Sequence, residues 1–226
     1  MIEMKKVVKK YATGNVALKG VSVKIEQGEF VYVVGASGAG KSTFIKLLYR
    51  EERASSGAIF LDGVDIVKLP SRKVPYLRRQ MGVVFQDFKL LPAKTVYENI
   101  AYALEVIEAD TAYIKKRVHT VLKLVGLLEK AKQFPGELSG GEQQRVSIAR
   151  AFVNKPRIII ADEPTGNLDP DTTMSIMRLF EKIHAEGTTV IMATHNRDVV
   201  DRLPHRVIRF ADGKIVHDAL RGGYSE

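Results

Sequence analysis

Short apolar runs separated by glycine-containing turns dominate the first quarter of the chain. Residues 21–25 alternate apolar and polar side chains, which is typical of an antiparallel strand with one exposed face. Residues 30–34 are apolar at every position, as in a strand buried on both faces of a parallel sheet. Apolar residues at helical spacing predict a helix over 41–49, and residues 58–61, before an Asp-Gly pair, predict another strand and turn.

The pattern changes between about residues 87 and 150. Residues 96–107 and 114–125 carry apolar side chains three and four positions apart, and strand-like alternation is scarce. This spacing predicts amphipathic helices. We therefore expect a helical insert between the strand-rich segments on either side.

Strands return after the insert. Residues 157–161 and 188–193 are apolar runs of strand length, and residues 171–186 between them have helical spacing and end at Gly187. Residues 207–216 predict a hairpin around an Asp-Gly turn. Because strands and helices alternate, the sequence predicts an α/β fold whose core is a parallel sheet with right-handed crossovers.

Composition narrows the function classes. The 226 residues include no cysteine, which excludes disulfides, a thiolate nucleophile and cysteine-ligated metal sites. The formal charge of +9 favours an anionic partner such as a nucleotide, a nucleic acid or a membrane surface, with solubility alone as the alternative. No apolar stretch is long enough to span a bilayer, and the N-terminus lacks the apolar core of a signal peptide. We therefore expect a cytosolic chain, with any membrane span supplied by another chain.

Residues 35–42, the phosphate loop, match the pattern G-x-x-x-x-G-K-[S/T]. Small residues leave backbone N–H groups free to surround a phosphate, and the helix that follows directs its positive end at the same point. We expect Lys41 to reach the β- and γ-phosphates and Ser42 to place its hydroxyl on Mg²⁺. A structural glycine turn is the alternative, but a position between a buried strand and a helix favours phosphate binding. The residues predicted here to bind nucleotide are Gly35, Ser37, Gly38, Ala39, Gly40, Lys41, Ser42 and Thr43.

Two carboxylates, Asp162 and Glu163, follow the apolar run of the second buried strand. Since the carboxyl ends of parallel strands meet at one edge of the sheet, Asp162 is expected beside the phosphate loop, where it can hold Mg²⁺ through water. Glu163 can act as general base on the attacking water. His195, just past the next strand, is expected to bond the γ-phosphate or to hold the water and Glu163 in register. Solvated turn acids and a structural histidine are the alternatives.

A second candidate phosphate site lies at residues 138–145, Leu-Ser-Gly-Gly-Glu-Gln-Gln-Arg. Ser139, Gly140 and Gly141 precede a helix predicted to run to about Phe152. A capping hydroxyl and free N–H groups make such a helix start an anion site. One interpretation is that this end touches nucleotide held by another subunit; the other is an N-cap with no ligand.

Together these segments resemble the nucleotide-binding domain of the ATP-binding cassette (ABC) family, from residue 4 to about residue 218. Residues 138–145 look like the family's signature motif, and Gln86 and Asp169 match residues of its Q-loop and D-loop. Tyr11 falls where the family has an aromatic residue that stacks on adenine, with an ordinary strand aromatic as the alternative.

The resemblance implies a P-loop NTPase fold in one nucleotide-binding domain. Its parts are a RecA-like parallel-sheet core, an N-terminal antiparallel β subdomain and an inserted α-helical subdomain. The core and β subdomain would occupy about residues 1–86 and 152–226, and the helical subdomain about residues 87–151.

The resemblance also implies an ATPase that uses ATP and Mg²⁺. Two copies would close head to tail over two nucleotides, the phosphate loop of one facing Ser139, Gly140 and Gly141 of the other, with Asp169 among the nucleotide-binding residues. The implied catalytic residues are Glu163, His195 and Gln86. The implied metal-binding residues are Ser42, Gln86 and Asp162.

The implied partner is an integral membrane protein, so the chain would work as a peripheral subunit on the cytoplasmic face of the cell membrane and bind no nucleic acid. A groove beside the Q-loop would grip a helix of that partner. Its predicted residues are Phe88, Leu90, Leu91, Val96, Tyr97 and Ile100. For Ile100, burial in the insert's own core is the favoured alternative.

Within the family, the chain resembles most the cassettes of bacterial cell-division complexes, on residues 85–91 (Phe-Gln-Asp-Phe-Lys-Leu-Leu) and 192–195 (Met-Ala-Thr-His). Such a cassette is implied to transmit force through its membrane partner, which then activates peptidoglycan hydrolases, and nothing need be transported. A lipoprotein-release or macrolide-efflux transporter is the alternative that keeps the same chemistry. A soluble nucleic-acid-linked cassette is opposed by the single phosphate loop and the lack of heptads, and an ATP-gated scaffold without hydrolysis is opposed by Glu163.

Overall fold

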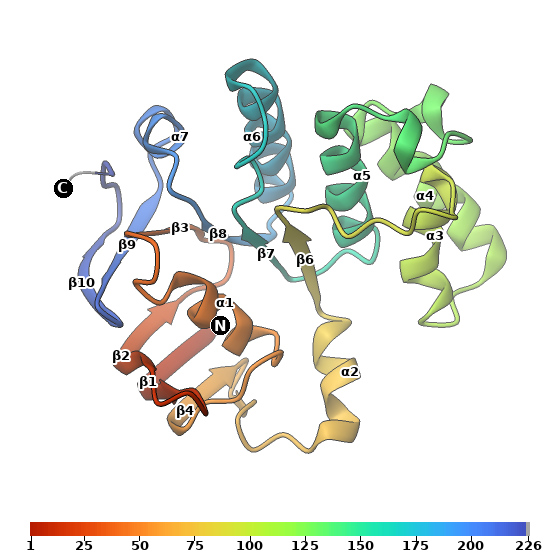
Figure 1. Ribbon diagram of the computed structural model, residues 1–226. Coiled ribbons are helices and arrows are strands. Elements are labelled where there is room, and N and C mark those ends of the chain that lie inside the picture. The colour runs from red at the N-terminus through yellow and green to blue at the C-terminus, as the bar shows by residue number, and fades with distance from the viewer. Residues whose placement is uncertain (225–226) are drawn as a thin grey trace.

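The computed structural model describes residues 1–224, and within them the larger sheet has six strands (Figure 1). Their order is β10-β9-β3-β8-β7-β6, and every neighbouring pair is parallel except β9 and β10. The strands are β3 Phe30–Val34, β6 Met81–Phe85, β7 Ile158–Asp162, β8 Thr189–Ala193, β9 Arg206–Ala211 and β10 Lys214–Ala219. The parallel sheet and the C-terminal hairpin confirm the predicted α/β class.

Helices cover both faces of this sheet (Figure 1). The helices are α1 Lys41–Leu48, α2 Val74–Arg78, α3 Val96–Glu105, α4 Thr111–Val125, α5 Gly140–Phe152, α6 Pro170–Ala185 and α7 Arg197–Arg202. Among the described residues, no helix combines the length and the apolar character that crossing a bilayer requires.

Strand β3 shows why its sequence is apolar throughout. Phe30, Tyr32 and Val34 belong to the core that β3 shares with α3 to α6, whereas Val31 and Val33 belong to the core on the opposite face, with α1 and the N-terminal strands. All five are at most 3% exposed. Because side chains alternate along a strand, only a run without polar residues can satisfy both faces.

The N-terminal strands form a separate antiparallel sheet, as the family resemblance implied. Within the described residues it has four strands in the order β2-β1-β4-β5. They are β1 Ile2–Lys10, β2 Val16–Ile25, β4 Ser56–Leu61 and β5 Val64–Asp65. This sheet packs beside α1 and therefore lies next to the phosphate loop (Figure 1).

The predicted helical insert is present as α3, α4 and α5. Local signals fix its helix ends: Thr95 and Glu98 form a capping box at α3, Asp110 caps α4, and α4 ends at Gly126 in the left-handed conformation. Apolar side chains at helical spacing, including Val118 and Leu122, are buried between the three helices and the large sheet. In Figure 1 α3 and α4 extend from the side of the sheet that ends with β6.

The sequence patterns did not predict β1, β6, α2 or α7. In β1 a bulge between Met4 and Val7 shifts the alternation, so Ile2, Met4 and Val7 all point inward although their spacing is uneven. The helices α2 and α7 span only five and six residues, too few for a helical period to be seen.

Candidate active site

The phosphate loop connects the end of β3 to the start of α1, as predicted. Two of its glycines are required by geometry. Gly35 and Gly40 have φ of +143° and +112°, and a Cβ on Gly35 would collide with the carbonyl of Phe210, while one on Gly40 would lie 2.8 Å from the carbonyl oxygen of Ala17. Only glycine therefore fits at these two positions, where the loop packs against the backbones of Phe210 and Ala17.

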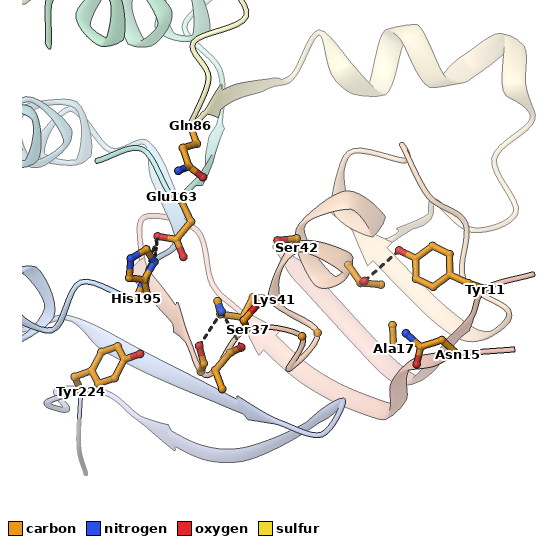
Figure 2. A pocket seen from close by; sticks show the side chains of 15 residues that line it. Tyr11, Asn15, Ala17, Ser37, Lys41, Ser42, Gln86, Glu163, His195 and Tyr224 are labelled. Atoms are coloured by element: carbon orange, nitrogen blue, oxygen red, sulfur yellow. Dashed lines mark hydrogen bonds and ion pairs between the residues drawn. The ribbon is translucent and has the colours of Figure 1, made fainter. Parts of the chain in front are cut away.

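Lys41 lies at the centre of the cavity above this loop. Its Nζ donates hydrogen bonds to the carbonyl oxygens of Gly35 at 2.7 Å and Ala36 at 3.1 Å. The ammonium group is thereby held over the loop, where a nucleotide's phosphates would meet it (Figure 2). The cavity has a volume of about 690 Å³, sufficient for a nucleotide. It is lined by Tyr11, Asn15, Ala17, Gly35, Ala36, Ser37, Gly38, Gly40, Lys41, Ser42, Thr43, Gln86, Glu163, His195 and Tyr224.

The two ends of the cavity have different chemistry (Figure 2). At one end the Tyr11 hydroxyl lies 3.1 Å from the Thr43 hydroxyl, and Lys9 sits 4.7 Å from the centre of the Tyr11 ring. A base that stacks on Tyr11 therefore has to use the other face of the ring. Glu163 and His195 lie at the opposite end, beyond Lys41. A nucleotide laid along the cavity would thus have its base near Tyr11 and its terminal phosphate near Glu163.

Oxygen ligands for Mg²⁺ gather beside the loop. The Ser42 hydroxyl donates to Asp162 Oδ1 at 3.5 Å, and Gln86 also faces this region, with its Nε2 donating to Asn167 Oδ1 at 3.2 Å. Residues 1–224 contain no cluster of three or more histidine, cysteine or acidic side chains that could hold a metal. This donor set fits Mg²⁺, which takes one or two protein oxygens and completes its shell with water and phosphate.

Burial raises the pKa of the Asp162 carboxyl above its usual range, with the charge of Glu163 adding to the rise and the Ser42 hydroxyl opposing it. A folded-state pKa above the unfolded value means that stability is lost as the pH rises through that interval. The ionised Asp162 thus disfavours the folded state unless a cation is present.

We therefore expect Asp162→Asn to raise the melting temperature of the nucleotide-free protein at neutral pH by a few degrees. The same variant should lose the added stabilisation that Mg²⁺ gives with ATP. Thermal melts with and without Mg²⁺ and ATP test both effects. A lower melting temperature for the nucleotide-free variant would contradict the assigned electrostatic cost.

Glu163 is held in a strained turn directly after β7. Its φ is +49°, its N–H donates to the carbonyl oxygen of Ala193 at 2.9 Å, and its side chain is 17% exposed. Its Oε2 accepts from the backbone N–H of His195 at 3.2 Å and lies 2.9 Å from His195 Nδ1. Non-glycine residues in this conformation cluster at functional sites. The structure therefore brings the two predicted residues together, with the imidazole positioned to orient the carboxylate.

Comparison with known proteins shows the family. Residues 18–166 match the family model described as ABC transporter. The chain belongs to the ABC transporter family. Two solved dimers of the cassette MJ0796, one of them a post-hydrolysis state bound to ADP and Pi, have TM-scores of 0.88 at 37% and 38% identity. Each alignment covers 98% of this chain and 100% of the other. The protein is accordingly an ATPase with an ABC-type fold.

Curated relatives in this family align over nearly the whole chain. The cell division ATP-binding protein FtsE is 59% identical in Bacillus subtilis and 58% in Streptococcus pneumoniae serotype 2, over 99% of this chain and 98% and 97% of those proteins. FtsE of Escherichia coli K12 is 49% identical over 95% of this chain and 97% of its own length.

The residues predicted for the signature motif and the D-loop of this ABC cassette do not line its own nucleotide cavity. Ser139 caps α5, accepting from the N–H of Glu142 at 3.3 Å, and Asp169 caps α6, accepting from the N–H of Thr172 at 2.9 Å. Hydrogen bonding by the Thr172 side chain, and then by its backbone N–H, lowers the pKa of Asp169. Ser139, Gly140, Gly141 and Asp169 are not among the residues that line the cavity. Within one described chain they therefore do not complete the nucleotide site.

The predicted partner groove of the ABC cassette is wrong at one residue. Val96 is fully buried in the packing of the helical insert, and so is Ile100, for which burial was favoured. Val96 and Ile100 are four residues apart and therefore lie on the same face of α3. That face packs against α4 and α5. Phe88, Leu90, Leu91 and Tyr97 remain partly exposed.

Tyr224 is a cavity residue that the sequence did not suggest. Its N–H donates to Asp201 Oδ1 at 2.8 Å, and the Arg197 guanidinium lies 5.0 Å from the ring centre. These contacts fix the ring beside α7, at the phosphate end of the cavity (Figure 2). No local pattern marks an isolated tyrosine after the last strand as a site residue, and only the return of the chain to α7 brings it there.

Proposed function

We propose that the chain is the ATP-hydrolysing subunit of a bacterial cell-division complex of the FtsE–FtsX type. Two copies close head to tail over two ATP·Mg²⁺, and hydrolysis reopens them. The motion passes to an FtsX-like integral membrane protein, which activates peptidoglycan hydrolases at the septum. The chain acts as a peripheral subunit on the cytoplasmic face of the membrane and binds no nucleic acid.

The observation that carries this proposal is the 49–59% identity with FtsE proteins of three bacteria over at least 95% of the chain. Identity of that extent covers both the phosphate-binding segments and the helical insert. The transporter cassette cbiO1 of Clostridium perfringens, at 32% identity and a TM-score of 0.90, shares the fold at lower similarity. The division role is therefore preferred over transport.

Within this proposal each site residue has a role. Lys41 and the loop N–H groups bind the phosphates. Ser42, Asp162 and Gln86 would hold Mg²⁺. Glu163, oriented by His195, takes the proton of the attacking water. The other loop residues and Tyr11 hold the nucleotide. Mg²⁺ held by these residues would offset the negative charge of the phosphates during hydrolysis.

The dimer is supported by the position of the signature residues. Ser139 caps α5, a helix of 13 residues whose N-terminal N–H groups make a suitable anion site. Ser139 does not, however, line the nucleotide cavity of its own chain. A second copy whose nucleotide docks at this end gives it a ligand. The dimeric MJ0796 structures supply the precedent.

The surface proposed to meet the membrane partner lies beside the Q-loop. Phe88, Leu90, Leu91 and Tyr97 are partly exposed there, and Tyr102, five residues further along α3, is 44% exposed. Phe88, Leu90 and Leu91 precede α3, and Tyr97 and Tyr102 lie on it. Apolar and aromatic side chains gathered at the surface are typical of a partner site.

The test is to trap Glu163→Gln with ATP·Mg²⁺ in membranes of the source organism and identify the membrane protein that co-purifies. We expect an FtsX-like protein, at a higher yield than with Lys41→Ala, which cannot form the ATP-bound state. A lipoprotein-release or efflux subunit in its place would move the function to transport. Recovery of no membrane protein would overturn the proposed complex.

A further inference from the structure

One buried glutamine joins the two loops that carry the catalytic side chains. Gln144 lies in the second turn of α5 and is 0% exposed. Its Nε2 donates to the carbonyl oxygen of Pro164 at 2.5 Å and also points at that of Phe85, at 3.4 Å. Phe85 directly precedes Gln86, and Pro164 directly follows Glu163. A single amide nitrogen therefore sits between the backbones of both catalytic segments.

The orientation of this amide is fixed by its partners. Both neighbours of Nε2 are carbonyl oxygens, which only accept, so the nitrogen has to face them. Its Oε1 is left buried with no hydrogen-bond partner among the described residues. A buried unpaired acceptor costs stability, and such groups call for a functional explanation. An apolar side chain of the same size would fill this space without that cost.

Further along, α5 packs closely against β6, the strand that ends at Phe85. A Cβ on Gly82 of β6 would collide with the backbone carbonyl of Ala151, so α5 and β6 touch backbone to backbone. Ser139, the N-cap of α5, marks the helix end that is proposed as the second phosphate site. Gln144 is thus the point where α5 contacts the loops of Gln86 and Glu163.

We propose that Gln144 is a positioning residue for ATP hydrolysis, which holds the Gln86 and Glu163 loops in register with each other and with α5. The inference rests on the proposed function, because it takes Glu163 as the general base. Through α5, the same bond ties each catalytic centre to the helix end that meets the other copy's nucleotide.

The test compares Gln144→Leu with Ser147→Ala. Both change a fully buried polar side chain of α5, and the Ser147 hydroxyl is likewise unpaired, but it bonds neither loop. We expect Gln144→Leu to lower kcat by about tenfold or more through misplacement of the catalytic groups, with KM and ATP affinity within about twofold. Ser147→Ala should leave kcat unchanged.

A second variant and a stability measurement keep the inference falsifiable. Gln144→Met conserves volume and flexibility, so it serves if Gln144→Leu fails to fold. Normal kcat in a folded Gln144 variant, whatever its melting temperature, would overturn the positioning role. Failure of the proposed function is distinguishable, since Glu163→Gln would then keep its turnover.

Discussion

Replacing Glu163 by glutamine is expected to lower ATP turnover by about 10²–10⁴-fold, the usual worth of a general base. Glutamine has the same shape and can still accept from the His195 N–H, so the strained turn after β7 is retained. It cannot take a proton from water at neutral pH. ATP affinity, which depends on the phosphate loop, should stay within about threefold. Steady-state turnover and equilibrium nucleotide binding measure the two quantities separately.

The chain offers a matched control for this variant. Glu181 also pairs with a histidine, its Oε1 lying 2.7 Å from His205 Nε2, but this pair is outside the cavity. Glu181→Gln should therefore leave turnover unchanged. If turnover in Glu163→Gln instead survives within about threefold of the original, the general-base assignment is wrong.

Glu163→Gln should also accumulate a dimer when ATP and Mg²⁺ are present. In the proposed cycle, closure needs only bound ATP and reopening needs hydrolysis, so blocking hydrolysis should stabilise the closed form. Size-exclusion chromatography with light scattering should show a dimer with ATP and a monomer with ADP. A monomer under both conditions would argue against the head-to-tail arrangement of Ser139 and the phosphate loop.

The sequence was most informative at positions where the local geometry allows only one type of residue. Residues 30–34 are apolar because both faces of β3 are buried, and Gly35 is glycine because the Phe210 carbonyl leaves no room for a Cβ. Requirements of this kind can be recognised within a short segment of the sequence. Because the carboxyl ends of parallel strands meet at one edge of a sheet, the sequence also predicts Asp162 beside the phosphate loop.

The features that escaped prediction depend on contacts between distant segments. Gly82 weakens the strand pattern of β6, and its reason is the backbone of Ala151 on α5. Val96 looks like a groove residue in the sequence but is covered by the insert's other helices. Tyr224 and Gln144 acquire their neighbours only through the fold, so no spacing rule could indicate them.

Replacing Lys41 by alanine is expected to abolish ATP binding and with it all turnover. The Lys41 ammonium is held over the phosphate loop by the carbonyl oxygens of Gly35 and Ala36, so no conformational search is needed to meet the phosphates. Alanine removes the positive charge but leaves a good helix former at the first position of α1. The fold should therefore survive, and circular dichroism can verify it.

Lys46 on the same helix provides the control. Removing its charge tests whether the loss of any positive charge on α1 weakens ATP binding, or only the loss of the charge in the cavity. It pairs with Glu51 at 3.3 Å and does not line the nucleotide cavity. Lys46→Ala removes the same charge one turn beyond the loop, so ATP affinity should change by less than about threefold, as expected for a screened surface charge. Isothermal titration of both variants with ATP·Mg²⁺ decides the matter. Because Lys41 is the one lysine aimed at the cavity among the residues that line it, normal affinity in Lys41→Ala would mean that nucleotide binds elsewhere on the chain.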